Sequence, residues 1–145
     1  MIPQYMQFRH EPPVTFGDCF RACVASILEL DINTVPHFHS DGCQDDGEIT
    51  DRLNDWLFSE HSLLKWGYAY PGSVPLADVL HYTGLNNPEL HWILHGRTAS
   101  GDAHAVICHG SVVVHDPSPW QTGGIVEPYE NAWSIIIFVP AVLAQ

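Results

Sequence analysis

This chain of 145 residues carries a cysteine, a histidine and an aspartate in contexts that suit nucleophilic catalysis. Cys19 stands at the predicted start of a helix, where backbone N–H groups and the helix dipole favour negative charge on sulfur. His104 opens a predicted strand, and Asp116 ends the next one. A histidine can take the thiol proton, and a carboxylate can fix the tautomer of the histidine ring. The three residues therefore predict a nucleophile, a general base and an orienting group.

The helix that begins at Cys19 must bury one face to hold the thiol in place. Apolar residues recur at helical spacing along it: Phe20, Cys23, Val24, Ile27 and Leu28. Asp18 is expected to cap the helix with its carboxylate, after a break at Gly17. Cys23 falls on the apolar stripe, so we expect it to be an inert core thiol.

Helical patterns come first in the chain and strand patterns second. Helices are expected over 19–30, from Glu48 onward, and from Ser73-Val74-Pro75 to a stop at Gly84. Strands are expected over 65–70, 90–95, 103–108, 112–115 and 133–139. The segment before Gly17 and the loop over 37–47 are expected to be irregular. This order predicts one α+β domain over 1–145, with N-terminal helices packed on a C-terminal antiparallel sheet.

The hairpin between His104 and Asp116 sets a geometric condition on this site. A two-residue turn at Gly110-Ser111 would place the two side chains on opposite faces of the sheet. A three-residue loop starting at His109, or a bulge with the same effect, would bring them onto one face. We predict the odd-length loop or the bulge. Asn131 and Asp102 are the substitutes for Asp116 if the hairpin is regular.

Composition limits the classes of partner. The formal net charge of −12 argues against nucleic acid and against an anionic membrane. There is no signal-like segment and no run of 18 apolar residues. The four cysteines form no recognisable disulfide framework, so a reducing cytosol is the expected compartment.

One loop is rich in metal-ligand residue types. It holds His37, His39, Cys43, Asp45 and Asp46, and Glu48 follows. The spacing matches none of the usual zinc patterns, in which paired ligands face a second pair farther along the chain. We therefore predict a solvated polar loop, with no metal and no cofactor.

The chain resembles the papain-like cysteine peptidase superfamily, in particular its small bacterial and phage members of the C39-peptidase-like type. The resemblance rests on three stretches: Gly17 to Cys23, Ala103-His104-Ala105-Val106 and His115-Asp116-Pro117. It implies a papain-like fold with Cys19 as nucleophile, His104 as general base and Asp116 as orienting residue. In that family a glutamine upstream of the cysteine donates to the oxyanion, and Gln7 is the match, with Gln4 as its competitor.

The predicted function is thiol-dependent acyl transfer, as a peptidase or amidase acting on a peptide or protein through a thioester at Cys19. An amine that intercepted the thioester would make the same site a transferase. The alternative is a catalytically silent binding or inhibitory protein that keeps the fold.

Overall fold

A computed structural model describes residues 1–43, 45–120 and 123–141. Its helices and strands, in chain order, are α1 (Cys19–Leu28), η1 (Ile32–Thr34, a 3-10 helix), α2 (Asp46–His61), β1 (Leu63–Pro71), α3 (Leu76–Asn86), β2 (His91–Thr98), β3 (Ala103–His109), β4 (Val112–His115), β5 (Ile125–Glu127) and β6 (Ala132–Pro140). The architecture is α+β, and the elements expected from the sequence are all present within a few residues of their predicted bounds. The short strand β5 was not predicted.

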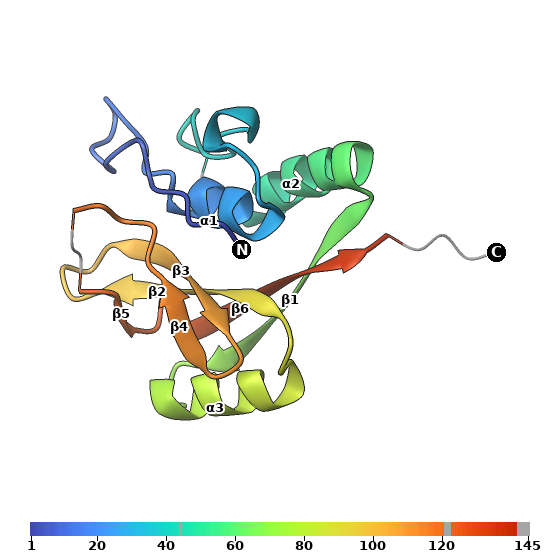
Figure 1. Cartoon of the computed structure of the whole chain (residues 1–145). Coiled ribbons are helices and arrows are strands. Elements are labelled where there is room, and N and C mark those ends of the chain that lie inside the picture. Colours follow the sequence, from blue (N-terminus) through green and yellow to red (C-terminus); the bar gives the residue numbers. More distant parts are fainter. Residues whose placement is uncertain (44, 121–122, 142–145) are drawn as a thin grey trace.

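The described strands form one antiparallel sheet (Figure 1). Its order is β1-β6-β2-β3-β4, and β5 pairs with the end of β2 where β6 leaves it. The hairpin strands β3 and β4 therefore lie at one edge. The buried run of β3, from His104 to Cys108, is covered on both faces.

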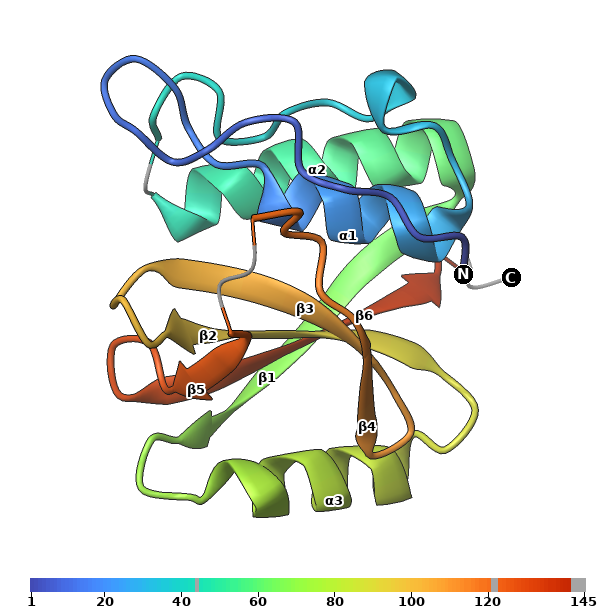
Figure 2. The same ribbon diagram turned by 60° about the vertical axis from the view of Figure 1, so that its left-hand side comes forward.

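Helices cover both faces of the sheet, which makes three layers (Figure 2). On one side α1 packs against β3 through Cys23, Ala105 and Ile107. On the other side α3 covers a second core that contains Val106 and Leu94. The sequence did not indicate which face of the sheet each helix covers, and α3 lies on the face opposite α1.

Helix α1 is buried on more than its predicted stripe. Ala22, Cys23, Val24, Ala25 and Ser26 are all fully buried. Ala22 and Ala25 share a core with residues of α2. The hydroxyl of Ser26 accepts from the backbone N–H of Gln4 and donates to the carbonyl of Ala22. This packing fixes the position of the helix, and with it the direction of Cys19.

Three local predictions are wrong. Asp18 precedes α1 but makes no side-chain cap. Gly84 does not end α3; it lies inside the helix against Gly110 and Ser111, where a Cβ would collide. Phe38 is buried in the loop that was expected to be exposed, because it packs on Phe20.

Within the described ranges, no helix has the length and apolar character needed to cross a bilayer.

Candidate active site

The thiol of Cys19 meets the imidazole of His104 between α1 and β3. Cys19 is the first residue of α1 and is partly exposed, and His104 is the second residue of β3. The two side chains are close enough for Cys19 to be one of the groups that raise the pKa of His104. The packing of α1 on Ala105 and Ile107 brings this pair together across 85 residues of chain, because it holds the start of the helix over the start of the strand.

A β-bulge brings Asp116 to the same histidine. The turn is the two-residue Gly110-Ser111, so the predicted three-residue loop is wrong. Gly110 has a φ of +57°, which suits the first position of a type II′ turn. After Cys108 pairs with Val113, Ile107 pairs with His115, so Val114 is an extra residue. The bulge was the other form of the prediction, and it is confirmed: it moves Asp116 onto the face of His104.

His104 is held by Asp116 on one side and by Cys19 on the other. Its Nε2 lies 2.8 Å from Oδ1 of Asp116, and its side chain is only 5% exposed. Burial by itself would lower the pKa of His104. The hydrogen bonds to Asp116 and Cys19 outweigh it and raise this pKa to about 9. An ionised Asp116 can only accept a hydrogen bond, so Nε2 is the protonated donor in this contact and Nδ1 is the nitrogen left for the thiol.

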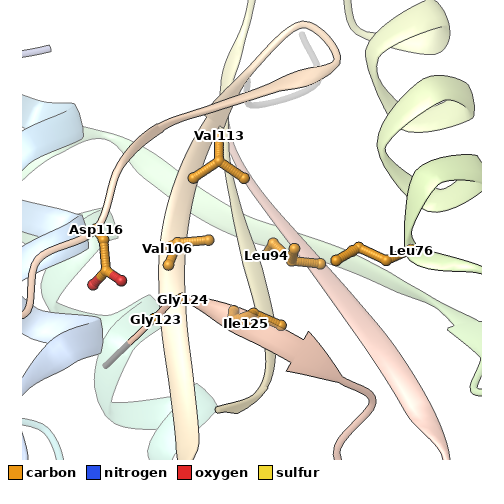
Figure 3. Close-up of a pocket in the computed structure, with 8 residues that line it drawn as sticks. All are labelled: Leu76, Leu94, Val106, Val113, Asp116, Gly123, Gly124 and Ile125. Carbon is orange, nitrogen blue, oxygen red and sulfur yellow. The ribbon is translucent and has the colours of Figure 1, made fainter. Parts of the chain in front are cut away.

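Asp116 is itself positioned by the chain that follows it. Its Oδ1 also accepts from the backbone N–H of Ser118, at 3.0 Å. Beyond it, on the α3 side of the sheet, lies a cavity of about 270 Å³ (Figure 3). The other lining residues are aliphatic or glycine: Leu76, Leu94, Val106, Val113, Gly123, Gly124 and Ile125. The orienting carboxylate thus lies between a polar partner and an apolar wall.

The carboxylate of Asp18 anchors the N-terminal segment beside Cys19. It accepts from the backbone N–H groups of Gln7 and Phe8, and Arg21 lies 3.3 Å from it. The side chain of Asp18 is fully buried, and that of Arg21 is 11% exposed. This role could not be predicted from the sequence, because an Asp before a helix is typical of a cap.

His115 also holds the N-terminal segment, through a hydrogen bond. Its Nε2 donates to the carbonyl of Gln4 at 2.7 Å, and Pro117 accepts from the backbone of Met6. The N-terminal segment is therefore fastened both to α1 and to the strand end that carries Asp116. Nothing in the sequence pattern indicated this contact, which spans 111 positions.

The side-chain amide of Gln7 is hydrogen-bonded to residues other than Cys19. Its amide nitrogen donates to Asn33 at 2.8 Å, and its amide oxygen accepts from Arg21. The amide oxygen of Gln4 accepts from the backbone of Ile32. No described hydrogen bond joins either glutamine to Cys19 or His104. The role of Gln7 as an oxyanion donor stays a prediction, and it requires the amide to leave Asn33.

The remaining cysteines differ from Cys19 in their surroundings. Cys23 and Cys108 are fully buried, and burial raises the pKa of both thiols, that of Cys108 to about 12. Cys43 is partly exposed, and its sulfur donates to Glu48 at 3.2 Å. Of the four, Cys19 alone has the His104 contact among the described residues.

The loop rich in ligand types is organised around an arginine. Arg52 pairs with Asp41 at 2.7 Å and with Glu48 at 2.6 Å. Within the described part of the chain, no three His, Cys, Asp or Glu side chains converge as a metal site requires.

No family model, curated protein or solved structure matches this chain, so the chemistry of the site follows from its own geometry.

Proposed function

We propose that this protein is a cysteine-dependent acyl-transfer enzyme that acts on a peptide or protein through a thioester at Cys19. The observation that carries the proposal is the position of His104, buried between the thiol of Cys19 and the carboxylate of Asp116. The order of nucleophile, base and orienting residue along the chain resembles that of the papain-like cysteine peptidases. We propose that the fold belongs to that superfamily.

Because the pKa of His104 is raised to about 9, the reaction starts from the ion pair in which the thiol proton of Cys19 already resides on Nδ1 of the imidazolium. The sulfur of Cys19 then attacks the carbonyl carbon, and a tetrahedral intermediate forms with charge on the former carbonyl oxygen. The imidazolium returns its proton to the leaving amine as the C–N bond breaks, which leaves an acyl thioester. Water, deprotonated by the same histidine, releases the acid and restores the thiol.

Two groups of the chain stabilise these charges. The carboxylate of Asp116 favours the imidazolium and holds the tautomer in which Nδ1 faces the sulfur. The backbone N–H of Cys19, at the start of α1, has no intrahelical acceptor, so it can donate to the oxyanion. The prediction for Gln7 adds a second donor.

Alkylation by iodoacetamide, mapped by peptide mass spectrometry, tests the proposal. Cys19 should be modified much faster than Cys23, Cys43 or Cys108, and His104→Ala should remove that difference while the fold is retained. An unreactive Cys19, or one whose rate does not depend on His104, would favour the silent binding protein instead.

A further inference from the structure

A second cavity lies beside the start of α1, between two loops that are far apart in the sequence. It has a volume of about 260 Å³. Segment 8–16 and loop 37–43 meet there, at the end of α1 that carries Cys19 (Figure 2). Its lining residues are Phe8, Pro13, Val14, Thr15, Phe16, His37 and Ser40.

We propose that this cavity, called here the aromatic pocket, receives an aromatic or large apolar side chain of the substrate. The inference rests on the proposed function, because it assigns a substrate class to the same site. Three features of the pocket support it: the residues that form the walls, the short chain separation between Phe16 and Cys19, and the absence of acidic lining residues.

The walls are fixed by specific contacts. The rings of Phe8 and His37 stack, with centroids 5.9 Å apart and an angle of 15°. His37 donates from Nε2 to the carbonyl of Phe16 at 2.8 Å, which joins the two loops. Gly42 has a φ of +75°, and a Cβ there would collide with the ring of Phe16. The carboxylate of Asp18 accepts from the backbone N–H of Phe8 at 3.0 Å.

The pocket lies within reach of a substrate bound at the thiol. Phe16 is three residues before Cys19, so their Cα atoms are separated by at most about 11 Å. An extended peptide advances about 3.3 Å per residue, so this distance corresponds to about three residues of substrate. At about 260 Å³ the pocket is smaller than a site for a drug-sized ligand, and it suits a single side chain.

The charge of the pocket contrasts with that of the whole chain. The protein has 17 acidic residues, yet none of the seven lining residues is acidic. Val14 lines the pocket and is 83% exposed, and Phe8 is 40% exposed. Covering these surfaces with an apolar side chain removes apolar area from water, at about 25 cal/mol per Å².

Matched electrophiles test the pocket without knowledge of the natural substrate. N-(2-phenylethyl)iodoacetamide and N-(2-carboxyethyl)iodoacetamide deliver the same reactive group with an aromatic or an acidic arm. With rates divided by those for glutathione, Cys19 should react about tenfold faster with the aromatic reagent. Val14→Asp should abolish that preference, so that the ratio of the two normalised rates falls to about one.

Val126→Asp is the matched control, because Val126 is an exposed valine outside the pocket, on β5. It should keep the preference. Equal normalised rates for the two reagents, or a preference that survives Val14→Asp, would overturn the substrate-binding role of the pocket. Rapid alkylation of Cys19 by plain iodoacetamide would show that the proposed function still holds in that case.

Failure of the proposed function has a different signature. If Cys19 is unreactive, N-acetylphenylalaninamide can be titrated into Cys19→Ala protein and followed by the methyl NMR signals of Val14. Shifts there that Phe16→Ala removes would support the pocket without the enzyme. The absence of shifts would overturn the pocket as well.

Discussion

Nε2 of His104 lies 2.8 Å from Oδ1 of Asp116, and the side chain of His104 is almost fully buried. Asp116 is 30% exposed and is also held by the N–H of Ser118. Since the same imidazole contacts Cys19, the properties of His104 report on the whole site.

Asp116→Asn should lower the pKa of His104. In the native protein burial opposes the charged ring, while the hydrogen bonds from His104 to Asp116 and Cys19 raise its pKa to about 9. The substitution removes the carboxylate and leaves the burial. Titration of the histidine ring signals by NMR measures both values. A His104 pKa that is the same in the two proteins would contradict the role of Asp116.

The same pair should make stability depend on pH. The pKa of His104 is higher in the folded chain than its ordinary value of 6.5, so its stabilisation is complete below 6.5 and is lost as the pH rises through about 9. The gap in unfolding free energy between native protein and Asp116→Asn should therefore be larger at about pH 6 than at about pH 10. Urea unfolding at the two pH values measures it. If the difference in unfolding free energy between the two proteins increased with pH, the stabilisation would not come from a protonated His104.

Deletion of Val114 should disconnect Asp116 from His104. Val114 is the extra residue of the bulge, and without it the regular register would turn Asp116 to the other face. Alkylation of Cys19 should slow, and the pKa of His104 should fall. Val114→Thr keeps the bulge and is the control, because Val114 is 44% exposed. If the deletion and the control behave alike, the bulge does not position the carboxylate.

Cys23→Ser should destabilise the protein, and Cys19→Ala should not. Cys23 is fully buried between α1 and the sheet, where a hydroxyl without a partner costs about 1–3 kcal/mol. Cys19 is partly exposed and contributes to the site instead. Urea unfolding gives both free energies. Equal losses of stability would mean that Cys19 is a core residue.

Asp18→Ala should be among the most destabilising changes near the site. It leaves Arg21 and two backbone N–H groups without their buried acceptor, and breaking such a pair costs about 3–5 kcal/mol. Asp31→Ala removes an exposed N-cap of η1 and should cost about 1 kcal/mol. Similar losses for the two variants, measured by urea unfolding, would contradict the anchoring role of Asp18.

The sequence was informative where a pattern repeats and silent where a contact is long-range. Helical spacing located α1, and alternating or β-branched runs located β3 and β4, so Cys19, His104 and Asp116 could be named. Because side chains alternate along a strand, the length of the hairpin loop decides whether His104 and Asp116 share a face of the sheet. No residue type indicated that a bulge at Val114 would bring them together. The true partner of Asp18 could not be read from its neighbours, since Gln7 and Phe8 are brought to it only by tertiary folding.

Reaction with p-nitrophenyl acetate shows whether Cys19 forms an acyl-enzyme with the help of His104. We expect a burst of nitrophenolate of about one equivalent per chain, with one acetyl group mapped to Cys19 by mass spectrometry. His104→Ala should slow the burst by orders of magnitude, and Cys19→Ala should abolish it. Acetylation spread over several side chains, or an undiminished burst in Cys19→Ala, would mean that Cys19 is not the nucleophile.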